Sequence, residues 1–234
     1  MTATVVRPAP PRPPSFLGAA AAVFAKDLRI EWRTKEILTT AGFFALLVTV
    51  MASVAFLDGE HTAPGAIWIP IAFSGVLALG RTWQREREEN ALVGLLVAPI
   101  PRAALFLGKG AGVLLFLLAV EAVIVPTVAL LFHLDLLAIA PRLLPLLLAG
   151  SIGIAGLGTL FGAMTVRTRA RDLVLATVLF PLLSPVLLSG VAGTKELFDG
   201  ATLRELSDYF LLLGVFDVLA VGGGIFLFGP LVDD

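Results

Sequence analysis

The sequence predicts an all-α integral membrane protein with six membrane-spanning helices, and three observations support this prediction. Of the 234 residues, 58% are hydrophobic and only 15% are charged, whereas soluble domains carry about 25% charged residues to cover their surface. The mean hydropathy is +0.95. Six segments with at most one charged residue each also reach the roughly 20 residues that a helix needs to cross a bilayer. The alternative, a soluble protein with very apolar core helices, does not fit so little charge.

The chain begins with a proline-rich tail, and a helix of amphipathic pattern follows it. Five prolines predict a flexible or polyproline tail over residues 1–15. Over residues 16–36 an apolar stripe opposes a basic side at helical spacing, which predicts a helix lying in the membrane interface. The stripe consists of Leu17, Ala21, Phe24, Leu28 and Trp32, and the opposite side carries Lys26, Arg29 and Arg33, with Asp27 and Glu31 between them. The alternative is a cytoplasmic extension of the first span with a solvated charged face.

The six predicted spans occupy most of the remaining chain and form one transmembrane domain over residues 16–234. They cover residues 37–57, 61–80, 110–132, 143–166, 173–194 and 209–232. Pro64 and Pro70 stand in the second span and indicate that its first turns are kinked or interfacial. The third span contains Glu121 and the sixth contains Asp217.

The distribution of basic residues predicts the orientation in the membrane. Fourteen of the 17 Lys and Arg residues lie before the first span or in the loops that follow the second and fourth spans. Cytoplasmic loops carry such an excess of positive charge. We therefore expect a bacterial inner-membrane protein with both termini in the cytoplasm.

The segment between the second and third spans, residues 81–110, is the longest cytoplasmic loop. It begins with many charges, continues with a short apolar stretch at 91–98, and is then interrupted by Pro99 and Pro101. Such a compact element is suited to docking in a groove of a cytoplasmic partner. The alternative is an amphipathic loop that packs on the chain's own helices, and the residues alone leave both interpretations open.

The order of acidic residues, Leu-rich turn, Pro-x-Pro and Gly-Lys in this loop resembles the second cytoplasmic loop of ABC-2-type exporter permeases. More narrowly, the chain resembles the CcmB family, the permease of the ABC system for cytochrome c maturation. The resemblance covers roughly residues 20–190 and is carried by five segments in the same order. These are Lys26-Asp27-Leu28-Arg29 with Glu31; Ala63-Pro64-Gly65 with Ile67-Trp68; Leu77-Ala78-Leu79 with Arg81; Leu92 through Pro99, Pro101 and Lys109; and Ala163, Thr165 and Val166 with Leu179, Pro181 and Pro185.

This resemblance implies the transmembrane subunit of an ABC transporter complex for c-type cytochrome biogenesis. The complex would export haem or drive the release of a haem chaperone. The implied partners are a CcmA-like ATPase that hydrolyses the ATP, CcmC-like and CcmD-like membrane proteins, and a CcmE-like haem chaperone outside. Haem would be a substrate of the complex, the chain alone would bind no cofactor, and a homodimer is one expected assembly.

An exporter permease must receive the motion of its ATPase through a stiff cytoplasmic element. Only the loop over residues 81–109 is long enough, so we expect it to contact the ATPase. Its acidic start stabilises a helix N-terminus, and its prolines fix the direction of the chain into the third span. The residues expected to form the contact are Glu88, Glu89, Leu92, Leu95, Pro99 and Pro101.

Two carboxylates are expected inside the membrane, Glu121 and Asp217. A charge near the bilayer centre costs at least ~2.5 kcal/mol, so both side chains should face protein or water. They are candidates for a translocation path or a proton site. The alternative for each is a carboxyl group bonded to a neighbouring helix.

Other chemistry has little support in the sequence. There are no cysteines, and the two histidines, His61 and His133, fall at the outer edge of the membrane, where solvated loop positions are expected rather than haem ligands. The run over residues 108–112 lacks the spacing of a phosphate-binding loop, so no ATP site is predicted. The net charge of -1 gives no reason to expect nucleic-acid binding.

The residues leave two other functions open. One is an ABC-2-type permease for a drug, lipid or polysaccharide. The other is a membrane scaffold of an assembly complex that transports nothing. No Ser/His pair, HExxH sequence or paired aspartates indicate an intramembrane hydrolase.

Overall fold

A computed structural model describes residues 14–55, 61–88, 94–95, 97–165 and 175–233. Within these ranges the chain is helical and contains no strand. The helices are α1 (Phe16–Thr34), α2 (Glu36–Ala55), α3 (Ala63–Glu88), α5 (Arg102–Leu131), α6 (Leu136–Thr165), the π-helical turn η2 (Leu175–Leu179), α8 (Phe180–Phe198) and α9 (Ser207–Asp233). Six of them are long and apolar enough to cross a membrane, so the predicted all-α membrane fold with six spans is confirmed.

Several helices are longer than the charge-free segments that predict them. α3 continues to Glu88, and α5 begins at Arg102 directly after Pro101. Proline suits this position because the first turn of a helix needs no backbone donor there. α6 begins at Leu136, where the Asp135 carboxylate accepts hydrogen bonds from the N–H groups of Leu137 and Ala138 at 3.1 and 3.3 Å.

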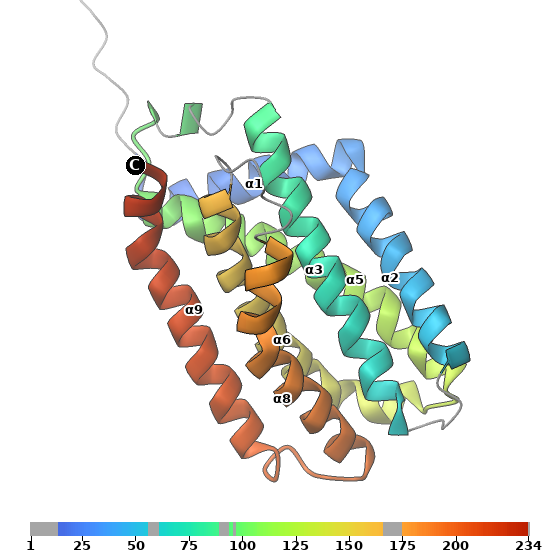
Figure 1. Ribbon diagram of the computed structural model, residues 1–234. Helices are drawn as coiled ribbons and strands as arrows, with labels where there is room; N and C mark the ends of the chain where they lie inside the picture. The colour runs from blue at the N-terminus through green and yellow to red at the C-terminus, as the bar shows by residue number, and fades with distance from the viewer. Residues whose placement is uncertain (1–13, 56–60, 89–93, 96, 166–174, 234) are drawn as a thin grey trace, which may run out of the picture.

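The predicted amphipathic helix is present as α1, and it lies across one end of the bundle (Figure 1). The chain turns out of α1 at Lys35, which adopts a left-handed conformation with φ 53°. The Glu31 carboxylate then accepts a hydrogen bond of 2.8 Å from the N–H of Leu38 near the start of α2. Helix α9 ends at the same end of the bundle as α1 (Figure 1), as an even number of spans requires.

Most of the apolar stripe of α1 is exposed, and only Phe24 of the stripe is half-buried. Leu17 and Trp32 are 75% and 77% exposed, whereas Ala19 and Val23 are the buried residues of this helix. An exposed apolar stripe on a helix that crosses the end of a membrane bundle suits a position in the lipid interface. The interfacial position itself stays a prediction.

Helix α6 packs against α3, α5, α8 and α9 and carries much of the core. Gly162 of α6 leaves room for the Trp83 ring of α3, which is fully buried. Toward the other end, Trp68 of α3 donates a buried hydrogen bond of 2.9 Å to the Thr194 hydroxyl of α8. A second, smaller core cluster lies around Trp83 and contains Val23, Leu105, Phe106 and Phe228. This second cluster connects α1 to the ends of α3, α5 and α9.

Candidate functional site

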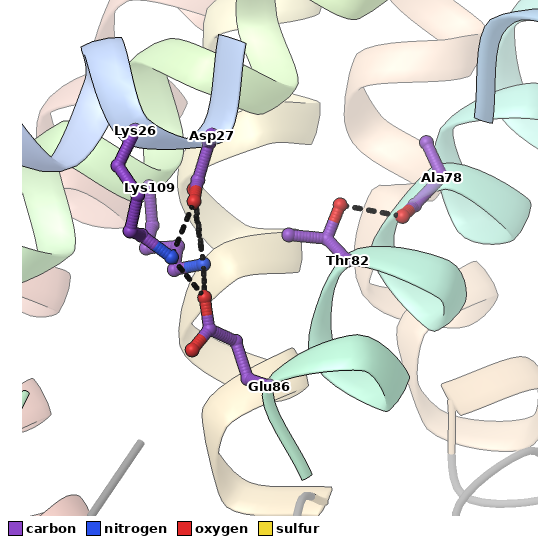
Figure 2. A network of polar contacts seen from close by, with 6 residues as sticks. All are labelled: Lys26, Asp27, Ala78, Thr82, Glu86 and Lys109. Atoms are coloured by element: carbon purple, nitrogen blue, oxygen red, sulfur yellow. Dashed lines mark hydrogen bonds and ion pairs between the residues drawn. The ribbon is translucent and has the colours of Figure 1, made fainter. Parts of the chain in front are cut away.

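Four charged side chains from three helices meet where α1 crosses α3 and α5, and Figure 2 shows them pointing toward one another. We call Lys26 and Asp27 of α1, Glu86 of α3 and Lys109 of α5 the charged cluster. The Lys26 ammonium lies 2.6 Å from a Glu86 oxygen and 2.8 Å from an Asp27 oxygen. The Lys109 ammonium lies 2.9 Å from the other Asp27 oxygen and also pairs with Glu86. Each ammonium therefore contacts both carboxylates.

These ion pairs matter for the stability of the fold because their side chains are buried. The Lys109 side chain is 1% exposed, the Glu86 side chain 5% and the Asp27 side chain 15%. A charge in such a position is strongly unfavourable unless an opposite charge lies beside it. Two positive and two negative charges in mutual contact meet this condition. Losing any one of them leaves a buried charge without full compensation.

The ion pairs also shift the pKa values of Glu86 and Lys26, which lie outside the predicted spans. Burial alone would raise the pKa of the Glu86 carboxyl, but the Lys109 and Lys26 ammonium groups outweigh burial and lower it. Burial alone would lower the pKa of Lys26, but the Asp27 and Glu86 carboxylates outweigh burial and raise it. Both shifts favour the charged forms of Glu86 and Lys26 at neutral pH.

A close helix contact brings the cluster together. At Gly108 of α5, a Cβ atom would stand 2.6 Å from the carbonyl oxygen of Ala20 and 2.7 Å from Cβ of Val23. Only glycine allows α1 to lie so close to α5 at this point. The next residue, Lys109, then reaches Asp27, and its ammonium also lies 5.7 Å from the centre of the Trp83 ring, within the range of a cation–π contact.

The cluster lies at the base of the loop between α3 and α5, residues 89–101. Glu86 is near the end of α3, and Lys109 follows the first turns of α5. Of the residues expected to contact the ATPase, Glu89 and Leu92 lie outside the described residues. Glu88 ends α3, but its side chain is likewise outside the described part of the structure.

The described part of the loop has one side toward the protein and one side away from it. Leu95 is partly buried and packs against the smaller core cluster around Trp83. Val97 is 82% exposed, and Pro99 and Pro101 are exposed as well. Leu95 therefore contacts the chain's own helices, whereas Val97 is an exposed apolar residue in the described part of the loop. The apolar stretch 91–98 is too short to show a periodicity that would distinguish an inward-facing residue from an exposed one.

The residues expected on the interfacial helix divide into two groups. Arg29, Trp32 and Arg33 are exposed. Lys26 and Asp27 lie in the charged cluster instead of on a solvated face. Glu86, which completes the cluster, was not predicted as a site residue.

The two intramembrane carboxylates both face α6. Glu121 is 4% exposed and accepts a hydrogen bond from the Ser151 hydroxyl. Asp217 is half-buried and packs so closely on Gly153 that a Cβ atom there would stand 2.7 Å from Oδ1. Among the described residues this oxygen has no hydrogen-bond partner. Glu121 thus fits a carboxyl bonded to a neighbouring helix, and a role of either residue in translocation stays a prediction.

Both histidines are exposed. His61 precedes α3, and His133 lies in the turn between α5 and α6, where it has a left-handed φ of 58°. No group of three or more His, Asp or Glu side chains that could hold a metal ion occurs within the described ranges.

Comparison with known proteins agrees with this architecture. The family model described as CcmB protein matches residues 18–229. A heme exporter protein B of Paracoccus denitrificans is 29% identical over 184 residues, which cover 77% of this chain and 84% of that protein. The corresponding protein of Bradyrhizobium diazoefficiens is 27% identical over 219 residues, 86% of this chain and 96% of the relative. That of Pseudomonas aeruginosa is 26% identical over 182 residues, with 76% and 81% covered.

Proposed function

This chain belongs to the CcmB family, and we propose that it is the membrane-spanning subunit of a haem exporter for c-type cytochrome biogenesis. The relatives that it matches are named as heme exporter proteins, and they are covered over most of their length. In this role the chain sits in the bacterial inner membrane with cytoplasmic termini. The distribution of basic residues supports that orientation.

The proposed partner is an ATPase subunit that binds beneath the membrane at the loop between α3 and α5. The exposed side of this loop, with Val97 and Pro99, supports such a contact because it offers apolar surface away from the bundle. CcmC-like and CcmD-like membrane proteins and a CcmE-like chaperone would complete the complex. Haem is then the substrate of the assembly.

One observation carries the coupling mechanism: the charged cluster joins both helices that flank this loop to α1. A displacement of the loop by the ATPase moves the ends of α3 and α5. Because Glu86 and Lys109 are buried and paired with Lys26 and Asp27, α1 must move with them or the ion pairs must break. The cluster therefore acts as a rigid joint that passes motion from the loop to the interfacial helix and the spans.

Complementation tests this function. The chain is expressed in a bacterium whose own CcmB protein has been deleted, and c-type cytochromes are quantified by their covalently bound haem. We expect cytochrome content to return and the chain to co-purify with the ATPase subunit. Absence of cytochrome c in cells whose membranes contain both the chain and the bound ATPase would reject the proposal.

A further inference from the structure

Helix α1 presents two guanidinium groups, those of Arg29 and Arg33, on its exposed side. No carboxylate of the described residues forms an ion pair with either group. The two acidic residues of α1 have other partners. Asp27 belongs to the charged cluster, and the Glu31 carboxylate accepts a backbone hydrogen bond at the start of α2. The exposed side of α1 therefore carries positive charge that the described part of the chain does not neutralise.

Large apolar side chains lie beside these guanidinium groups. Trp32 is 77% exposed, and as the third residue after Arg29 it is the neighbour of that residue on the helix surface. Leu28 is 42% exposed and lies one turn before Trp32. A tryptophan and a leucine beside arginines on one exposed surface suit the boundary between lipid headgroups and hydrocarbon, where one part of the surface is apolar and the other is charged.

The exposed apolar surface continues from α1 onto α2. After the turn at Lys35, Leu38 and Phe43 of α2 are 40% and 69% exposed. Helix α2 is long and apolar enough to cross the membrane, so its exposed side chains contact acyl chains. Arg29 and Arg33 lie on the last two turns of α1, directly before this span. Their position is thus the level at which the headgroups of the same leaflet begin.

The charges on this surface indicate the class of headgroup. Arg29 and Arg33 are one helical turn apart, with about 5–6 Å between their Cβ atoms, so both can donate to the same phosphate. Arginine binds phosphate through paired N–H donors. The ammonium of a zwitterionic headgroup would meet two cations here and no unpaired carboxylate on α1. A headgroup with net negative charge meets no such repulsion.

We propose that Arg29 and Arg33 bind the headgroup of an anionic phospholipid of the cytoplasmic leaflet, with Trp32 and Leu28 against the start of its acyl chains. The proposal depends on the interfacial position of α1 and not on the export of haem. The bound lipid holds α1 beside the charged cluster, which joins this helix to α3 and α5. An acidic surface of the ATPase subunit is the competing partner, and the experiment separates the two.

Tryptophan fluorescence tests the proposal, because Trp32 is the exposed one of the three tryptophans, whereas Trp68 and Trp83 are 1% and 0% exposed. The full chain is reconstituted into vesicles of phosphatidylcholine and phosphatidylglycerol, and one lipid at a time carries brominated acyl chains, which quench tryptophan on contact. We expect phosphatidylglycerol to be enriched beside Trp32 by about fivefold or more, since each basic residue at an anionic surface contributes about this factor. Added salt should reduce the enrichment. Trp32→Phe gives the quenching of the two buried rings, which is subtracted.

Paired substitutions test whether the two guanidinium groups cause the enrichment. Arg29→Gln with Arg33→Gln should remove most of it while both brominated lipids still quench Trp32. Arg29→Lys with Arg33→Lys keeps both charges and should retain most of the enrichment. The matched control is Arg142→Gln with Arg204→Gln, which removes two exposed guanidinium groups toward the opposite end of the bundle and should leave the enrichment unchanged.

Three results would overturn the proposal. The first is equal quenching by the two brominated lipids in the unmodified chain. The second is an enrichment that persists in the variant with glutamine at positions 29 and 33. The third is that this variant keeps the enrichment and loses the co-purifying ATPase, in which case the guanidinium groups bind the ATPase instead. A chain without lipid preference that still co-purifies with the ATPase and supports cytochrome c would reject this proposal alone and leave the exporter function intact.

Discussion

The Lys26 ammonium of α1 lies 2.6 Å from the Glu86 carboxylate of α3, which joins two residues 60 positions apart in the chain. This ion pair places α1 on the end of α3 next to the loop that follows it. The contribution of this contact to the stability of the protein can be measured.

Breaking the charged cluster from one side should destabilise the protein strongly. Lys109→Met removes one of two buried ammonium groups and leaves Glu86 and Asp27 sharing Lys26. Removing one partner of a buried ion pair costs roughly 3–5 kcal/mol. The double variant Lys109→Met, Glu86→Leu leaves the Lys26–Asp27 pair intact and should recover much of the loss. Thermal unfolding in detergent checks both; a double variant less stable than the single one would contradict the pairing.

The same cluster should make stability fall at acidic pH. The folded state lowers the pKa of Glu86 below its ordinary value of 4.5. Its contribution to stability is therefore complete above pH 4.5 and is lost as pH falls from there through the folded pKa. The difference in melting temperature between the unmodified chain and Glu86→Gln should shrink below about pH 4.5. A difference that stays constant down to pH 3 would show that Glu86 is not held ionised by its partners.

The close contact between α1 and α5 predicts intolerance of a methyl group at Gly108. Alanine there places Cβ 2.6 Å from the Ala20 carbonyl oxygen, so α1 must shift. Such overpacking costs about 1–3 kcal/mol, and it should also separate Lys26 and Asp27 from Lys109. The matched control is Gly222→Ala in α9, where a Cβ atom meets nothing within 4 Å. Equal melting temperatures of the two variants would show that α1 does not rest on α5 as described.

The orientation can be tested by cysteine labelling, because the chain contains no cysteine. His61→Cys and Ser15→Cys each provide one thiol, and both positions are exposed. In intact cells we expect a membrane-impermeant maleimide to label Cys at position 61 and to label position 15 only after lysis. The reverse pattern would invert the proposed topology.

The sequence was sufficient to predict the six spans, because hydropathy alone decides which segments can lie in lipid. It underestimated their length at α3 and α5. Charged residues beside a span suggest a loop, whereas here Glu86 and Lys109 are helical, and each pairs with an opposite charge on α1. Pairing of opposite charges across helices offsets the desolvation cost of burying them.

The charged cluster itself could not be predicted from spacing. Its geometry depends on the direction of α1, which is set by the left-handed turn at Lys35 and by the contact at Gly108. Neither feature appears as a periodic pattern in the sequence. The division of the loop into an inward Leu95 and an outward Val97 also depends on the core around Trp83, which only the folded chain assembles.

We propose that the exposed side of the loop between α3 and α5 binds the ATPase subunit. Val97 is the residue to change, because it is 82% exposed and its replacement leaves the packing of Leu95 intact. Val97→Asp places a charge on the proposed apolar contact, at a cost of about 2 kcal/mol or more if that contact is desolvated. Leu203→Asp, at an exposed position between α8 and α9, is the matched control.

The deciding measurement is the amount of ATPase subunit that co-purifies with each variant, together with the cytochrome c content of the same cells. We predict that Val97→Asp loses most of the bound ATPase and of the cytochrome c while its melting temperature is unchanged, and that Leu203→Asp keeps both. Normal ATPase binding and normal cytochrome c in the Val97→Asp variant would contradict the claim that this loop couples the ATPase to the membrane helices.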